Sequence, residues 1–175
     1  MEFIHFLLEL LTHTKDVLLH LFQQYGPYIY AILFLIIFVE TGFVIMPFLP
    51  GDSLLFTAGL LCAQDSGLSI FILIPLLIIA AVLGDNVNYF VGKYFSETVL
   101  KWQFKGKPLV NPEWIQEVHN YFEKHGTKTI IIARFMPIVR TVTPFVSGVG
   151  KMDYKTFLPY DIFGGILWVT SVTII

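Results

Sequence analysis

The sequence predicts an all-α integral membrane protein, and its composition and its pattern of apolar runs carry that prediction. Hydrophobic residues make up 55% of the 175 residues and charged residues 14%, whereas a typical soluble domain is about 25% charged. The mean hydropathy is +0.72. Long apolar runs alternate with short breaks that contain proline and glycine. We therefore expect residues 1–175 to form a single membrane domain of spanning helices, re-entrant helical hairpins and interfacial amphipathic helices.

Composition also argues against several functions. A net charge of -2 gives no basic face for nucleic acid. Cys62 is the single cysteine, so neither an intrachain disulfide nor a thiolate metal cage is expected. The five histidines show no metal-ligand spacing with carboxylates. We therefore expect no metal and no cofactor, and a transporter is favoured over an enzyme.

The first third of the chain predicts an interfacial helix followed by a hairpin. Polar residues recur every three or four positions over residues 1–25 in an otherwise apolar run, which is typical of a helix lying along the membrane surface. Glu2 stands where a signal peptide carries basic residues, so we expect this helix to be retained. Residues 28–63 predict a helix, a break at Pro47 to Gly51 and a second short helix. Two crossings need about 20 residues each, so a re-entrant hairpin is favoured.

The rest of the chain repeats this arrangement. Residues 68–92 predict a transmembrane helix, and the lysine-containing stretch 93–128, with an amphipathic helix of its own, is expected in the cytoplasm by the positive-inside rule. Residues 129–150 predict a second re-entrant hairpin, and residues 156–175 a second transmembrane helix. Aligning Met46-Pro47 with Met136-Pro137 relates the two halves. Hairpins entering from opposite sides would make an inverted repeat, as in many secondary transporters.

The two breaks carry charges that a membrane segment normally lacks. Arg134 and Arg140 flank the second break, and Glu40 and Asp52 flank the first. An arginine at membrane depth costs about 2.5 to 3.5 kcal/mol, so each needs an anion. That anion is either a carboxylate in a structural ion pair or the phosphate of a ligand, which suits a guanidinium fork; both can hold in turn. Glu40 and Asp52 are then candidates for proton coupling, although Asp52 also suits helix capping.

Asp85 is a further candidate, on one helical face with Tyr89. The pairs Gly51-Asp52 and Gly84-Asp85 are compatible with an intramembrane aspartyl protease. Gly-Asp alone is a weak motif, and a protease leaves both arginines unexplained.

Taken together, these motifs resemble the DedA family, which includes the proteins with a VTT, or SNARE-associated Golgi, domain. The motifs that carry the resemblance keep their order along the chain: Glu40, Phe48-Leu49-Pro50-Gly51-Asp52-Ser53-Leu54-Leu55, Gly84-Asp85-x-x-x-Tyr89-x-x-Gly92-Lys93, Tyr121-Phe122-x-x-x-Gly126, Arg134-Phe135-Met136-Pro137-Ile138-Val139-Arg140-Thr141, Pro144, Gly148 and Gly165-x-x-Trp168.

The resemblance implies two opposed re-entrant hairpins in the bacterial plasma membrane and translocation of a lipid phosphate, undecaprenyl phosphate or a phospholipid, driven by the proton-motive force. It implies phosphate binding by Arg134 and Arg140 and proton coupling by Glu40 and Asp52. Passive scrambling and proton-coupled exchange of small cations are the alternatives. Lys93 stands where the family often has arginine, and the family continues through a further spanning helix, so we expect a truncated chain. The expected supporting residues are Asp85, Tyr89, Pro50, Gly51, Pro137 and Thr141.

Overall fold

The computed structural model describes the greater part of the chain from residue 24 onward. The described residues are 16, 24–42, 51–63, 68–99, 103–104, 107–108, 120, 124 and 128–175, with the backbone alone for 95–99, 103–104, 107–108 and 137–138. The first break, with Pro47 and Pro50, lies outside these residues. So do almost all of the two predicted amphipathic helices.

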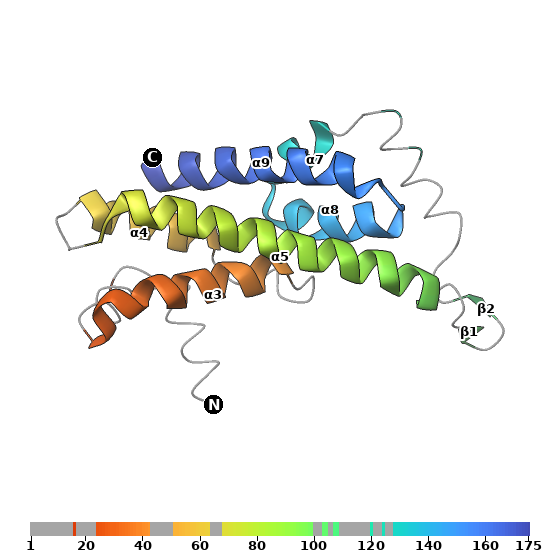
Figure 1. The fold of residues 1–175 in the computed structure, drawn as a ribbon, viewed down its shortest axis with the longest axis horizontal. Helices are drawn as coiled ribbons and strands as arrows, with labels where there is room; N and C mark the ends of the chain where they lie inside the picture. The colour runs from red at the N-terminus through yellow and green to blue at the C-terminus, as the bar shows by residue number, and fades with distance from the viewer. Residues whose placement is uncertain are drawn as a thin grey trace.

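The predicted all-α class is confirmed (Figure 1). The only strands that the described residues form are a two-residue antiparallel pair. The elements in chain order are η1 (Gly26–Tyr28), α3 (Ile29–Gly42), α4 (Gly51–Ala63), α5 (Ile70–Val99), β1 (Gln103–Phe104), β2 (Lys107–Pro108), α7 (Lys128–Ala133), α8 (Pro137–Val149) and α9 (Tyr154–Ile174).

The second predicted break is present and has a local cause. Helix α7 ends at Ala133, and the chain turns through Arg134 and Phe135 before α8 begins at Pro137. Met136 is extended, with φ -112 and ψ 107, as the residue before a proline prefers. Proline suits the first helical position because its missing N–H has no intrahelical partner there. The Met-Pro pair therefore separates the two helices.

Two helices are long and apolar enough to cross a membrane, Ile70–Tyr94 and Tyr154–Ile174. Helix α5 continues to Val99, past the expected end at residue 92, so Lys93 lies in the helix and not in an aqueous loop. Helix α9 begins two residues before the expected residue 156. In both regions the sequence holds no residue that stops a helix, and the polar side chains of α5 find partners on other helices.

The helices pack in a reciprocal pattern. Helix α5 packs against α3 and α8, helix α9 packs against α4 and α7, and the two long helices also contact each other. In each half, the first short helix thus packs on the long helix of its own half. The second short helix packs on the long helix of the other half.

Two glycines allow the second short helices to approach the long helices closely. A Cβ on Gly59 of α4 would lie 1.9 Å from the carbonyl oxygen of Thr173 in α9. A Cβ on Gly148 of α8 would lie 2.1 Å from the carbonyl oxygen of Tyr89 in α5. Small residues at such contacts are typical of helix packing in membranes. When Met46-Pro47 is aligned with Met136-Pro137 and one residue is allowed to be missing from the second half, these two glycines occupy equivalent positions.

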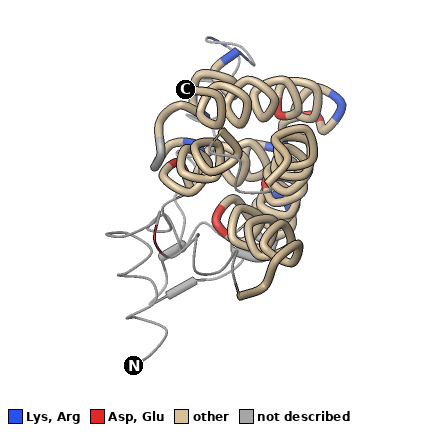
Figure 2. The backbone as a smooth tube through the Cα atoms, turned by 90° about the vertical axis from the view of Figure 1, so that its left-hand side faces the viewer, with Lys and Arg blue, Asp and Glu red and all other residues tan. Residues whose placement is uncertain are grey.

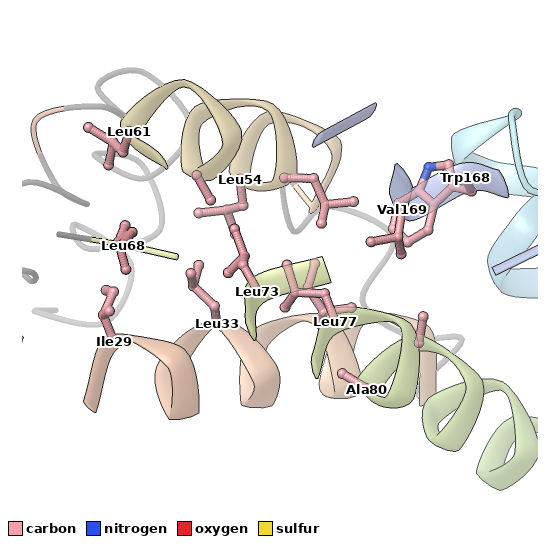
Figure 3. Packing of buried hydrophobic residues seen from close by; sticks show 14 residues of the cluster. Ile29, Leu33, Leu54, Leu61, Leu68, Leu73, Leu77, Ala80, Trp168 and Val169 are labelled. Carbon is pink, nitrogen blue, oxygen red and sulfur yellow. The ribbon is translucent and has the colours of Figure 1, made fainter. Parts of the chain in front are cut away.

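The main apolar core joins α3, α4, α5 and α9. Leu33, Leu54 and Leu73 lie in its middle, and Trp168 lies at one end (Figure 3). Large apolar side chains also cover much of the outside: Phe71 is 87% exposed and Leu35 57%. An apolar exterior of this kind suits contact with lipid chains.

Candidate functional site

Charged residues are few in the bundle (Figure 2), and six of them form two clusters. Each cluster contains one arginine and two carboxylates, contributed by helices from both halves. The first, the Arg140 cluster, contains Arg140, Glu40 and Asp52. The second, the Arg134 cluster, contains Arg134, Asp85 and Asp161.

The Arg140 cluster joins α8 to both helices of the first hairpin region. Arg140 donates from Nη2 to Glu40 Oε1 at the end of α3, and from Nη1 to Asp52 Oδ1 at the start of α4 over 2.7 Å. The side chains of Arg140 and Glu40 are 5% and 2% exposed, but that of Asp52 is 41% exposed. The cluster is therefore buried on one side and accessible on the other.

Trp168 of α9 completes the surroundings of Arg140. The guanidinium carbon lies 4.3 Å from the centre of the indole ring, within the range of a cation–π interaction. The indole Nε1 donates to Asp52 Oδ1 over 2.9 Å. Trp168 is 2% exposed, so its ring holds both partners of the ion pair in place.

Two polar atoms of the Arg140 cluster lack hydrogen-bond partners. Within the part of the chain that the structure describes, Arg140 Nε and Glu40 Oε2 are buried and have no hydrogen-bond partner. Buried polar groups normally have partners, and an unmade bond to a charged group is costly. An arginine with a free donor beside an accessible carboxylate is suited to receive an anionic oxygen.

Gly51 has a steric reason to be glycine. A Cβ there would lie 1.8 Å from Glu40 Oε2, far inside van der Waals contact. The first residue of α4 thus leaves room for the Glu40 carboxylate.

The Arg134 cluster lies deeper. Arg134 Nη2 donates to Asp85 Oδ2 of α5 and to Asp161 Oδ1 of α9 over 2.5 Å. The side chains of Arg134, Asp85 and Asp161 are 4%, 5% and 1% exposed. One guanidinium nitrogen therefore ties together the two helices that can span the membrane.

Two glycines of α9 lie against this arginine, and one of them makes room for it. A Cβ on Gly164 would lie 2.9 Å from Arg134 Cδ, and a Cβ on Gly165 would lie 3.4 Å from Arg134 Nη1. The Gly164 contact is closer than a real Cβ allows, so glycine is required there, whereas the Gly165 contact is ordinary.

Asn88 of α5 connects the halves beside the Arg140 cluster. Its Nδ2 donates to the carbonyl oxygen of Thr141 over 2.6 Å and to that of Thr41 over 3.3 Å. Thr141 follows Arg140 in α8, and Thr41 follows Glu40 in α3. Asn88, 1% exposed, therefore fixes the backbone beside each member of the Glu40 and Arg140 pair.

The structure places the charged residues that the sequence singled out in two separate clusters, with Asp85 beside Arg134. Arg140 pairs with both Glu40 and Asp52, whereas Arg134 pairs with neither. Tyr89 lies elsewhere: its hydroxyl donates to the Met152 carbonyl, and its ring stacks on Phe157 at 4.7 Å. Thr141 contributes its carbonyl to Asn88, and Pro137 begins α8.

Sequence reasoning missed three members of these sites as functional candidates: Asp161, Trp168 and Asn88. A signal existed for two of them, since Asp161, Gly165 and Trp168 recur at helical spacing on one face of α9. That face contacts both arginines. Asn88 carried no such signal, because its partners are backbone carbonyls on two distant helices.

An apolar groove of about 810 Å³ lies on the outer side of α5, beside α3. Its lining residues are Phe38, Leu83, Asn86, Val87, Phe90, Val91 and Tyr94. Among them Asn86 brings a polar side chain, which accepts a hydrogen bond from the Tyr154 hydroxyl over 2.6 Å. The groove is wide and open enough for a hydrocarbon chain.

Buried ion pairs and an apolar exterior define a helical membrane protein, and comparisons with known proteins agree. Residues 49–175 match the VTT domain. Protein DedA of Escherichia coli (strain K12) is 45% identical over 174 residues, which are 99% of this chain and 78% of that protein. The uncharacterized membrane protein ML0287 of Mycobacterium leprae (strain TN) is 44% identical over 139 residues, 79% of this chain and 61% of that protein.

A third relative is also named as a membrane protein. Inner membrane protein YqjA of Escherichia coli (strain K12) is 36% identical over 148 residues, 83% of this chain and 64% of that protein. No solved structure matches the chain. The chain belongs to the VTT domain, or DedA, family of membrane proteins.

Proposed function

We propose that the protein moves a lipid phosphate, either undecaprenyl phosphate or a phospholipid, across the bacterial plasma membrane, and that the proton-motive force drives this movement. The Arg140 cluster carries the proposal. It holds a guanidinium with an unused donor at a place where one carboxylate partner is 41% exposed. In this proposal the protein is a multi-pass transporter and not an enzyme.

The net charge of the Arg140 cluster would couple phosphate binding to proton binding. Glu40, Asp52 and Arg140 together carry a formal charge of about -1, taking each ionised side chain as one unit. A phosphate would be repelled from such a site. Protonation of Glu40 and Asp52 leaves Arg140 as a positive fork, which binds phosphate oxygens with short, charge-assisted bonds. Phosphate and protons would therefore load together.

Arg140 is the better of the two predicted phosphate-binding residues. Its cluster is accessible through Asp52, whereas every member of the Arg134 cluster is almost fully buried. We propose that Arg140 contacts the phosphate and that Arg134 holds the two long helices in register. Direct phosphate binding by Arg134 stays a prediction.

The packing supports two opposed re-entrant hairpins. We propose that α3 with α4 and α7 with α8 form these hairpins, related by an inverted repeat. The reciprocal packing on α5 and α9, with Gly59 and Gly148 at equivalent contacts, is what such a repeat would produce. The lipid tail would remain outside, and the groove on α5 offers it an apolar path.

Reconstitution into liposomes tests the function. Labelled polyprenyl phosphate or phospholipid is followed across the bilayer with and without an imposed pH difference. The proposal predicts movement that a pH difference accelerates. Lipid movement at the same rate with and without the pH difference would identify a passive scramblase. Ion flux without lipid movement would identify a cation exchanger. Product formation in detergent would identify a hydrolase.

The variant Glu40→Gln tests the role of Glu40 in the same liposome assay. Because glutamine imitates the protonated carboxyl, the variant should bind phosphate with less dependence on pH, and the slope of transport against pH should fall. Asp153→Asn is the matched control, since Asp153 is an exposed acid just before α9. An unchanged pH response in Glu40→Gln would remove this residue from the coupling.

A further inference from the structure

The Arg134 cluster contains more negative charge than its arginine neutralises. Asp85 and Asp161 both contact a single nitrogen of Arg134, and all three side chains are buried. Two ionised carboxylates and one guanidinium leave about one uncompensated negative charge. A buried charge without a partner is strongly disfavoured, and such a group normally takes up a proton.

The positions of the two carboxyl groups indicate where a proton would lie. Asp85 Oδ2 and Asp161 Oδ1 both accept from the same atom, Arg134 Nη2, so the two groups lie close together. Two ionised carboxylates have acceptors only, so neither can donate to the other. Asp161 Oδ2 is buried and has no partner among the described residues. A proton on Asp85 would supply the missing donor between the two groups.

The other charged residues nearby do not neutralise the excess negative charge of the Arg134 cluster. Arg134 itself lies in the turn after α7, and Arg140 of α8 acts on Asp85 at longer range. Glu40 of α3 and Asp52 of α4 already pair with Arg140, so that cluster is also negative overall. The described lysines of these helices and of the turn between α8 and α9, which are Lys93, Lys128, Lys151 and Lys155, are all exposed.

We propose that Asp85 and Asp161 hold one proton between them, so that the contact between the two long helices is a buried proton-binding site. The site is distinct from the Glu40 and Asp52 pair. Its occupancy sets the strength of the tie between α5 and α9, because loss of the proton leaves two facing carboxylates that share one guanidinium. A part for this proton in transport rests on the proposed function, whereas the site itself does not.

Infrared spectroscopy of the purified full chain in lipid tests the proposal at neutral pH. The wild type should show the carbonyl stretch of a protonated carboxyl group. Asp161→Asn should lose that band, because the remaining Asp85 then pairs with Arg134 alone and stays ionised. Asp85→Asn should lose it for the same reason, and it serves if the first variant does not fold. The control Asp153→Asn should keep the band.

The outcomes separate this proposal from the proposed function. Loss of the band in both variants supports the shared proton, whether or not lipid moves in liposomes. Identical carboxyl bands in the wild type and in both variants would show that Asp85 and Asp161 are fully ionised, and would overturn it. Asp161→Asn should also unfold at a temperature close to that of the wild type, because asparagine imitates the protonated form. A large loss of stability in both asparagine variants would also count against it.

Discussion

The two arginine clusters contain the same charges in different surroundings. Each combines one guanidinium with two carboxylates from other helices. Around Arg134 all three side chains are buried, Gly164 of α9 leaves room for the arginine, and the atom without a partner is a carboxylate oxygen, Asp161 Oδ2. Around Arg140 one carboxylate is partly exposed, an indole covers the guanidinium, and the arginine itself has a donor without a partner. The two clusters therefore differ in access and in which group lacks a partner, and on the proposed function this difference makes Arg134 an anchor and Arg140 the phosphate-binding residue.

The largest expected difference concerns stability. Arg134→Gln leaves two buried carboxylates without a cation, and breaking a buried pair in this way costs about 3 to 5 kcal/mol. Arg140→Gln should cost less, because water can reach Asp52. Unfolding of both variants in the same detergent, followed by circular dichroism, measures the difference. Equal losses in the two variants would mean that the clusters do not differ as anchors.

A smaller effect tests the packing around Arg134. Gly164→Ala places a methyl group 2.9 Å from Arg134 Cδ, and overpacking of a core costs about 1 to 3 kcal/mol. Gly165→Ala is the matched control, because its methyl group lies at an ordinary 3.4 Å and the change gains helix propensity. Thermal unfolding should rank the wild type above Gly164→Ala, with Gly165→Ala near the wild type. The reverse order of the two alanine variants would argue against the close contact.

The smallest effect concerns Trp168. Trp168→Phe keeps an aromatic face beside Arg140 but removes the donor to Asp52, and one such hydrogen bond contributes about 1 kcal/mol. Transport should slow modestly while the fold is kept. Trp168→Leu removes the aromatic face as well and should have a larger effect. If Phe and Leu at this position behave alike, the cation–π contact contributes nothing.

Much of the fold could be predicted from local signals. Met136-Pro137 marks the break between α7 and α8, because proline and the residue before it restrict the backbone whatever surrounds them. The apolar run after residue 68 predicts a spanning helix for the same local reason. The end of α5 was harder to place, since nothing in the sequence between Gly92 and Val99 says whether the helix enters water or continues.

The sites were predictable only in part. Charges within otherwise apolar segments point to Glu40, Asp52, Arg134 and Arg140. The sequence gives no reason to assign different roles to the two arginines, because both flank the same Met-Pro break. Which carboxylate meets which arginine depends on how α5, α8 and α9 cross, and that is a property of the packed bundle. Asp161 therefore emerges as a partner of Arg134 only in the folded chain.

Binding of a short-chain polyprenyl phosphate to the reconstituted protein tests the central distinction most directly. A charged hydrogen bond is worth about 1.5 to 3 kcal/mol, and about 1.4 kcal/mol corresponds to a factor of ten. Arg140→Lys, which keeps the charge but loses the fork, should weaken binding at least about tenfold. Arg134→Lys should leave the affinity of the folded protein near that of the wild type. Unchanged affinity in Arg140→Lys, or an equal loss in both variants, would contradict the assignment of Arg140 as the phosphate-binding residue.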